Sequence, residues 1–200
     1  MLFAISGSQG SGKTTVLNAL KDKGYPVVER KTSRSILEEW GVTLSQVNND
    51  RELTIKFQDE ILSRKRQDEH EAVNDISRIW FTERTYADLF TYALIAIGKD
   101  NEYSNWINAY FKRCANAQTN YSANFMLPIG YFDIEHDGVR GANDHYANMV
   151  DLVMRDTLTN MNRFLGIDGK TLIPLGPKTV DITASSVDDR VKLILKNIFK

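Results

Sequence analysis

Cysteine, proline and long apolar runs are scarce in this chain of 200 residues, and each scarcity argues against a class of protein. The one cysteine, Cys114, cannot form an internal disulfide and lies in no nucleophile motif, so we expect a buried helix residue. The segment Met1–Ser6 has neither a basic start nor a long hydrophobic stretch, which predicts a chain that is not exported and does not span a membrane. We therefore expect a cytoplasmic protein in a reducing compartment.

An excess of charge of either sign is also missing. The formal net charge is -1 and the pI is about 6.3, so the chain has no general attraction to a nucleic-acid phosphate backbone. Its hydrophobic content of 42% and charged content of 26% are those of an ordinary globular protein. No repeat, low-complexity run or linker divides the sequence, which predicts a single domain over residues 1–200.

Sequence signatures of a zinc site and of a guanine-binding site are absent as well. The histidines His70, His136 and His145 lack the spacing of a zinc site, and none pairs with a cysteine, so we predict no metal chemistry beyond magnesium. The Asn-Lys-x-Asp sequence by which GTPases commonly read guanine does not occur, which argues against a Ras-like switch.

Hydrophobic periodicity predicts strands that alternate with helices, which is typical of an α/β protein with a mainly parallel sheet. The five expected strands are residues 2–6, 26–29, 79–82, 124–129 and 171–175. The expected helices are residues 13–23, 33–40, much of 44–77, 85–97, 105–117, a helix that ends near 164, and 187–199. We predict a three-layer fold with a five-stranded sheet between helices and a lid-like, glycine-containing segment at about 133–145.

Gly7-Ser8-Gln9-Gly10-Ser11-Gly12-Lys13-Thr14 has the spacing of a Walker A loop and lies between a predicted strand and helix, as that motif requires. Its glycines allow backbone N–H groups to surround a phosphate, next to the positive end of the helix dipole. Lys13 is predicted to bridge the β- and γ-phosphates, and the Thr14 hydroxyl to coordinate Mg²⁺, while Thr15 completes the nucleotide-binding segment. The predicted cofactors are therefore ATP and Mg²⁺, in a P-loop fold that serves kinases, ATPases and switches alike.

Glu83 and Arg84 follow a hydrophobic strand, and ligands of open parallel sheets bind beyond the carboxyl ends of the strands. The segment Phe81–Asp88 resembles the Glu-Arg-Ser motif of deoxyribonucleoside kinases and, more loosely, the Asp-Arg-containing motif of thymidylate kinases. Thr85 stands where the former have serine. The resemblance implies that Glu83 lies near magnesium and its waters and that Arg84 contacts the acceptor end of the reaction.

Glu29 ends the second predicted strand and resembles the carboxylate with which such nucleoside kinases receive the proton of the attacking hydroxyl. With Arg30 and Arg34, it also resembles the NadR-like kinase domain and related AAA-type nucleotide-binding domains, which are often virus-encoded. Asp137-Gly138-Val139-Arg140 adds to that resemblance. It implies that Arg140, with Arg155 as second choice, is brought to the transferred phosphoryl group by a closing lid.

Two further groups have ordinary structural interpretations. Arg64-Lys65-Arg66, within the helical region 44–77, is expected mostly on a solvated face. The aromatic residues Tyr103, Trp106, Tyr110 and Phe111 are expected to pack in the core rather than to stack on a base.

Together these patterns predict an ATP-dependent, Mg²⁺-assisted phosphotransferase that acts on a nucleotide- or nucleoside-like small molecule. Arg30, Arg34 and Arg84 lie on the expected acceptor side and favour a deoxynucleoside monophosphate, because arginine binds phosphate through two parallel hydrogen bonds. Asp88 is a further candidate for substrate binding. Two alternatives stay open, a kinase of a hydroxymethylated pyrimidine base in DNA and a P-loop ATPase coupled to a partner. The sequence also leaves a homodimer open.

Overall fold

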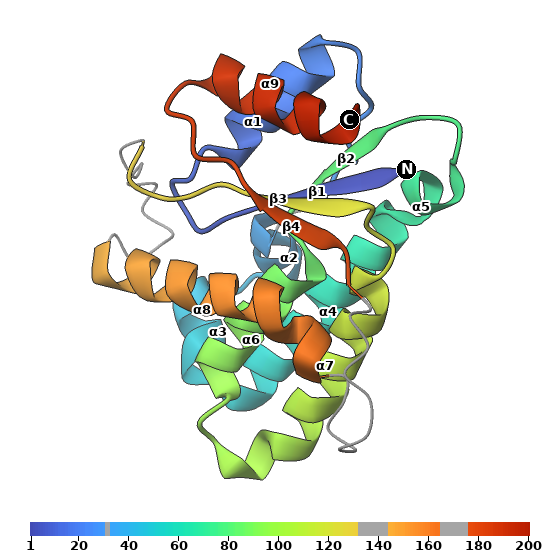
Figure 1. Cartoon of the computed structure of the whole chain (residues 1–200). Coiled ribbons are helices and arrows are strands. Elements are labelled where there is room, and N and C mark those ends of the chain that lie inside the picture. Colours follow the sequence, from blue (N-terminus) through green and yellow to red (C-terminus); the bar gives the residue numbers. More distant parts are fainter. Residues whose placement is uncertain (31–32, 132–143, 165–175) are drawn as a thin grey trace.

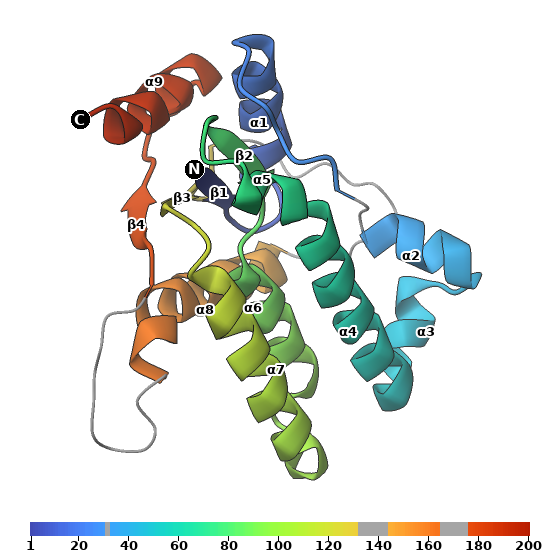
Figure 2. The ribbon, with the colours of Figure 1, turned by 90° about the vertical axis from the view of Figure 1, so that its right-hand side faces the viewer.

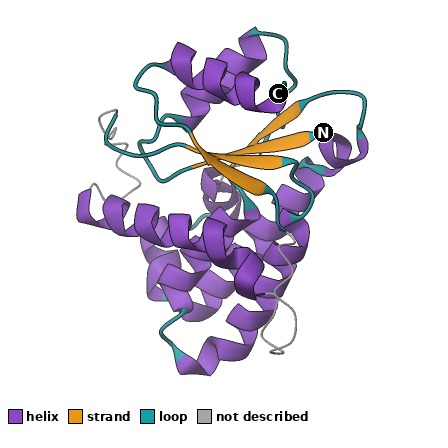
Figure 3. Ribbon diagram, in the orientation of Figure 1, coloured by secondary structure: helices purple, strands orange, loops and turns teal. Residues whose placement is uncertain are grey.

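A sheet of four parallel strands, in the order β2-β1-β3-β4, lies between two layers of helices in the described part of the chain (Figures 1 and 3). The computed structural model describes residues 1–30, 33–131, 144–164 and 176–200. In chain order the elements are β1 (Leu2–Ser6), α1 (Lys13–Asp22), α2 (Ser33–Trp40), α3 (Leu44–Asn49), α4 (Arg51–Asp68), α5 (His70–Asn74), β2 (Trp80–Glu83), α6 (Tyr86–Ile97), a 3-10 turn (Asn101–Tyr103), α7 (Ser104–Gln118), β3 (Ala123–Met126), α8 (Asp144–Phe164), β4 (Lys178–Asp181) and α9 (Val187–Ile198).

The alternation of side chains along β1 builds a core on each face of the sheet. Phe3 and Ile5 pack with residues of α1 and α9 on one face, whereas Leu2 and Ala4 belong to a larger core with α4, α6, α7 and α8 on the other. Figures 1 and 2 show the same two layers, with α1 and α9 on one side of the strands and the remaining long helices opposite. A strand buried on both faces reads as a continuous apolar run, which is why β1 is easy to predict.

The region 44–77 forms three helices rather than one. Thr43 and Gln46 make a capping box at the start of α3, and the Asp50 carboxylate accepts a hydrogen bond of 3.0 Å from the Leu53 N–H at the start of α4. Asp50 itself is extended, with φ of -122°, so the helical hydrogen-bonding pattern breaks there. One face of α4 is apolar, and its residues Phe57 and Leu62 are buried in the cores that the helix contacts.

The predicted α/β class with a parallel sheet is confirmed, but two of the five predicted strands are not seen as predicted. Residues 26–29 make only one bridge, between Val27 and Phe81, and two hydrogen bonds to Phe81. Pro26 has no N–H to donate, and the chain leaves the sheet after Val28, so no ladder forms. The predicted strand at 171–175 lies outside the described residues, as does all of the lid-like segment before residue 144.

β4 is not among the strands predicted from the sequence. Its ends, Lys178 and Asp181, are exposed and its middle residues only half-buried, as expected of an edge strand. Such a strand lacks the apolar run that marked the other strands, and it forms because its backbone pairs with β3.

Three of the four aromatic residues predicted to pack in the core around α7 do so, whereas Tyr103 is only half-buried in the 3-10 turn before that helix. Tyr110 and Phe111 are buried, the Trp106 and Tyr110 rings stack with centroids 4.9 Å apart, and Phe111 meets Phe90 edge-on. Cys114 is buried in the same helix, which confirms that prediction as well. Among the helices that the structure describes, none is both long and apolar enough to cross a membrane.

Candidate active site

Two glycines of the loop between β1 and α1, Gly7 and Gly12, are required for different reasons. Gly7 has φ of 147°, and a Cβ atom there would lie 2.6 Å from the Leu127 carbonyl oxygen and 2.6 Å from Ser11 Oγ. Gly12 is left-handed, with φ of 82°, and begins α1 without a side chain that could cap it. The first N–H groups of α1 therefore keep their capacity to bind an anion.

Replacing Gly7 with alanine tests this geometry. We expect Gly7→Ala to lower the free energy of unfolding by about 1–3 kcal/mol beyond the cost of the backbone conformation alone, and to abolish nucleotide binding. The matched control is Gly24→Ala, because Gly24 has φ of 89° but nothing within 4 Å of its ideal Cβ position. Urea unfolding and nucleotide titration of both variants give the comparison, and equal behaviour of the two would contradict the close approach at Gly7.

Lys13 lies inside the loop that precedes it. Its side chain is buried, and its Nζ donates to the Ser8 carbonyl oxygen at 2.8 Å and to Ser11 Oγ at 3.4 Å. Thr14 and Thr15, the next two residues of α1, are exposed. The ammonium is therefore already placed over the loop at which a phosphate would be bound.

Arg190 of α9 supports this loop from its other side, and the sequence analysis missed it. Its Nη1 donates to the Ser11 carbonyl oxygen at 2.5 Å, and its Nε donates to the Ala184 carbonyl oxygen at 2.7 Å. The residue is fully buried. Its position among the apolar residues of α9, one residue before Val191, is the signal that could have revealed it.

Glu83 and Arg84 lie at the carboxyl end of β2, directly beside the start of the glycine loop. Ile5 pairs with Glu83 in the sheet, and the Arg84 N–H donates to the Ile5 carbonyl oxygen at 2.8 Å. Arg84 has φ of 65° and is the one non-glycine residue with a positive φ in the described ranges. A left-handed residue of this kind costs roughly 1–2 kcal/mol, and such strain collects at functional sites.

The Arg84 guanidinium points toward α6. It lies 5.1 Å from the centre of the Tyr92 ring, and its Nη1 donates to the Tyr92 hydroxyl at 3.3 Å. Stacking on the ring orients the planar donor group without neutralising its charge, which leaves the charge available to an anion.

Positive charge surrounds the Glu83 carboxylate. Burial opposes ionisation of Glu83, but the charges of Lys13, Arg84, Arg30 and Lys65 outweigh that desolvation and hold the pKa of the carboxyl below its usual value. The carboxylate is therefore ionised at neutral pH, among four cations that come from four separate segments of the chain.

Asp88 is fully buried below the site rather than open to it. Its Oδ1 accepts hydrogen bonds from Ser6 Oγ at 2.5 Å and from Thr85 Oγ1 at 2.6 Å. Thr85, which stands in the place of serine, also caps α6 by accepting from the Asp88 N–H. Asp88 thus joins the last residue of β1 to the first turn of α6.

The predicted acceptor residues differ in where they lie. Arg30 reaches the site, since its Nη1 donates to the Glu83 carbonyl oxygen at 2.8 Å. The Glu29 side chain is 87% exposed and pairs with Lys21 at 3.2 Å on the outside of α1. Arg34 is exposed in the first turn of α2. The structure therefore brings Arg30, but not Glu29, to the Glu83–Arg84 pair.

The predicted lid arginines are not both within the described part of the chain. Arg140 lies outside it. Arg155 of α8 binds two carboxylates, Asp151 at 2.7 Å and Asp181 of β4 at 2.7 Å, and so joins α8 to the edge of the sheet.

The prediction that Arg64-Lys65-Arg66 is mostly solvated is wrong for its middle residue. Arg66 is exposed and Arg64 binds Glu39 and Glu60, but the Lys65 side chain is completely buried against Glu69. Position 65 follows Ile61 and Leu62 at helical spacing, so it falls on the apolar face of α4, and Glu69 follows one turn later. That spacing is the signal that could have revealed the pair.

The oxygen atoms of Thr14 and Glu83 suit a magnesium ion that is bound together with phosphates. Mg²⁺ keeps several waters and takes only one or two protein ligands in such sites. In the described ranges no group of three or more histidine, cysteine or acidic residues could hold a metal by itself. The donors that are present therefore fit a magnesium–nucleotide complex.

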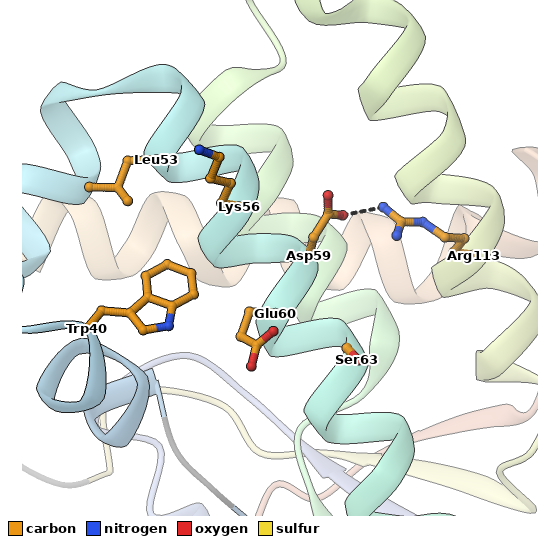
Figure 4. A pocket seen from close by; sticks show the side chains of 7 residues that line it. All are labelled: Trp40, Leu53, Lys56, Asp59, Glu60, Ser63 and Arg113. Atoms are coloured by element: carbon orange, nitrogen blue, oxygen red, sulfur yellow. Dashed lines mark hydrogen bonds and ion pairs between the residues drawn. The ribbon is translucent and has the colours of Figure 1, made fainter.

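A separate surface hollow of about 640 Å³ lies between α2, α4 and α7 (Figure 4). Its lining residues are Trp40, Leu53, Lys56, Asp59, Glu60, Ser63 and Arg113. Asp59 and Arg113 already form an ion pair across it. None of the predicted site residues within the described ranges lines this hollow, so we place the candidate active site at the glycine loop and the end of β2.

Comparison with known proteins identifies a family and a fold. Residues 2–171 match the model of a family described as an AAA domain. Deoxyadenosine kinase from M. mycoides with bound dATP superimposes with a TM-score of 0.66 at 15% identity, over 100% of both chains. NadR protein in complex with NR has a TM-score of 0.64 at 14% identity, over 98% of this chain and 48% of its own.

A third solved structure has the same fold. Thymidylate kinase from Candida albicans has a TM-score of 0.58 at 16% identity, over 99% of this chain and 90% of its own. None of the curated proteins matches the sequence. At these identities the likeness to the solved structures shows the fold alone.

Proposed function

This chain belongs to the AAA domain family and has the fold of the P-loop nucleotide kinases, and from that premise we propose that it is an ATP-dependent, Mg²⁺-assisted phosphotransferase. The resemblance to this superfamily that the sequence motifs indicated is confirmed. The observation that carries the proposal is the ionised Glu83 beside the strained Arg84 and the loop lysine, Lys13. Phosphoryl transfer needs such an arrangement, because it depends on positioning and on positive charge around the transferred group.

A deoxynucleoside monophosphate is the acceptor that we propose. Arg30 and Arg84 add two positive charges beside Glu83, and guanidinium groups bind phosphate with directed, paired hydrogen bonds. The superimposed structures include a deoxyadenosine kinase and a thymidylate kinase, whose names place nucleosides and nucleotides among the acceptors that this fold serves. An acceptor of this class would assign the protein to deoxynucleotide metabolism.

The residues of the chain would have the following roles. The loop from Gly7 to Thr15 binds the phosphates of ATP, with Lys13 between the β- and γ-phosphates, and the Glu83 carboxylate accepts hydrogen bonds from water at the site. Mg²⁺, held by Thr14 and Glu83, would supply neutralisation of the phosphate charge. The acceptor oxygen forms a bond to the γ-phosphorus as the bond to the bridging oxygen breaks. ADP leaves. The phosphate oxygen of a deoxynucleoside monophosphate is already ionised and gives up no proton; where the acceptor is a nucleoside hydroxyl, its proton passes to a carboxylate, for which Glu29 is the proposed base.

Glu29→Gln tests that assignment. Because the Glu29 side chain is exposed and paired with Lys21, it must leave Lys21 to reach an acceptor. We expect the variant to keep ATP affinity and to lose transfer to a nucleoside hydroxyl by about 10²–10⁴-fold, the usual contribution of a general base, because only a hydroxyl acceptor has a proton to give up. Turnover that is unchanged across the pH range would remove Glu29 as the base, and Glu83→Gln is the companion variant that shows whether the buried carboxylate takes that role instead.

The acceptor itself is tested with γ-labelled ATP and Mg²⁺. The panel contains nucleosides, deoxynucleoside monophosphates, nicotinamide riboside and DNA that carries hydroxymethyluracil. We expect label in a deoxynucleoside monophosphate. Label in a nucleoside would support a kinase but contradict the proposed acceptor. Label in the DNA would do the same and would favour a kinase of a modified base in DNA.

A further inference from the structure

Two oppositely charged side chains, Lys65 and Glu69, are buried next to the carboxyl end of β2. Lys65 Nζ lies 2.6 Å from Glu69 Oε1, and the two side chains are 0% and 1% exposed. An ion pair withdrawn from water is costly unless further hydrogen bonds satisfy both groups, and apolar residues in its place are often equally stable. The other partners of the two side chains therefore indicate what the pair does.

Glu69 is held from three directions. Its Oε1 accepts from Lys65 and, at 2.7 Å, from Thr82 Oγ1 of β2. The Tyr121 hydroxyl lies 3.1 Å from each carboxylate oxygen. The Tyr121 ring in turn stacks on Tyr86 of α6, with centroids 5.5 Å apart. The carboxylate is thereby fixed between α4, β2 and the segment before β3.

Lys65 connects the fixed Glu69 carboxylate to the active site. Its Nζ donates to the Glu83 carbonyl oxygen at 3.1 Å, and Arg30 Nη1 donates to the same oxygen at 2.8 Å. On the other side of that peptide group, the Arg84 N–H donates to the Ile5 carbonyl oxygen at 2.8 Å. Both polar atoms of the peptide group between Glu83 and Arg84 are thus held by other segments of the chain. Figure 2 shows α4 and α5 leading to β2 from the helical layer.

A fixed peptide group matters at this position because Arg84 is left-handed, with φ of 65°. A strained residue keeps its conformation only where the surrounding structure holds it. The conformation of this one peptide sets the directions of the Glu83 carboxylate and the Arg84 guanidinium, the two groups to which the proposed function assigns chemistry. A network that only stabilised the core would not need to bond to the peptide group between Glu83 and Arg84.

We propose that Lys65 is a positioning residue of the active site: anchored by Glu69, its ammonium holds the Glu83 carbonyl and so directs the Glu83 carboxylate and the Arg84 guanidinium into the site. The assignment rests on the proposed function for the roles of Glu83 and Arg84. It needs no contact between Lys65 and any ligand.

The test uses the double variant Lys65→Met/Glu69→Gln, which removes both charges and leaves no buried carboxylate without its cation. Lys56→Met is the matched control, because Lys56 is an exposed lysine on the same helix. Glu83→Gln is the reference for loss of the carboxylate. The first readout is the affinity for a non-hydrolysable ATP analogue with Mg²⁺ and with EDTA, and the second is kcat and KM for the acceptor.

We expect the double variant to bind the analogue in EDTA as the wild type does and to lose the gain in affinity that Mg²⁺ brings, as Glu83→Gln does. It should also lower kcat by about 10–100-fold. Lys56→Met should match the wild type. A folded double variant with wild-type Mg²⁺ dependence and kcat would overturn the proposal and leave the pair a core element.

A milder change covers the case in which the double variant does not fold. Tyr121→Phe keeps the ring and removes only one hydroxyl that anchors Glu69, and it should lower the Mg²⁺-dependent gain in affinity in the same direction. Wild-type values in that variant would equally count against the proposal. A wild-type protein that binds Mg²⁺–nucleotide but phosphorylates no acceptor would refute the proposed function, while the Mg²⁺ dependence of the variants would still decide the role of Lys65.

Discussion

Lys13→Ala is expected to lower kcat by about a hundred- to a thousand-fold, the usual loss when one preorganised donor to the developing charge is removed. The Lys13 ammonium is buried in the loop and already bonded to Ser8 and Ser11, so it needs little rearrangement to meet a phosphate. Alanine retains the helical backbone of α1 and removes only the charge and its stem. Steady-state transfer from labelled ATP gives the turnover number.

Lys23→Ala is the control for this variant, because Lys23 is exposed just beyond the other end of the same helix. It should leave transfer unchanged. If Lys13→Ala turned over as fast as the wild type while both variants stayed folded in a thermal melt, the glycine loop would not be the site of catalysis.

Arg84→Ala is expected to have an effect as large as that of Lys13→Ala, but on use of the acceptor. We expect kcat/KM for the acceptor to fall by about 10²–10³-fold, with ATP affinity nearly unchanged, since the guanidinium lies at the strand end beside Glu83 rather than in the glycine loop. Alanine at this position bears the same backbone strain as arginine, so the change isolates the loss of the side chain. Initial rates at varied acceptor and varied ATP separate the two parameters.

Arg78→Ala provides the comparison for Arg84→Ala. Arg78 precedes the other end of β2, is about half exposed, and binds Asp75 and Glu71. Removing it should change neither parameter. A fall in ATP affinity in Arg84→Ala that equals the fall in kcat/KM would instead assign Arg84 to nucleotide binding.

The parts of the site that could be predicted from sequence are those that local spacing determines. The glycine loop has a fixed pattern between a strand and a helix, and Glu83 and Arg84 directly follow a buried strand, so their edge of the sheet could be inferred. Glu29 shows the limit of that argument. It also follows an extended segment, but the chain leaves the sheet after one bridge, and the side chain turns outward to Lys21.

The residues that sequence reasoning missed depend on contacts between distant segments. Lys65 is buried because Glu69, Thr82 and the Glu83 carbonyl meet it, and Arg190 is buried because the Ser11 carbonyl lies 179 positions away in sequence and beside it in space. A charged residue in a helical pattern is normally predicted to be solvated, because burial without partners is costly. Helical spacing points to Glu69 as a partner of Lys65, but the partners in other segments of the chain could be known only from the fold.

Partition of label from γ-labelled ATP between acceptor and free phosphate, in a single turnover with Mg²⁺, decides whether the protein is a phosphotransferase. We expect label to enter the acceptor, with free phosphate a minor product, and Glu83→Gln and Arg84→Ala to lower transfer without raising phosphate release. Label that appeared only as free phosphate, and faster in the presence of DNA or a protein partner, would contradict the claim. The chain would then be a P-loop ATPase, in which Glu83 and Arg84 serve hydrolysis.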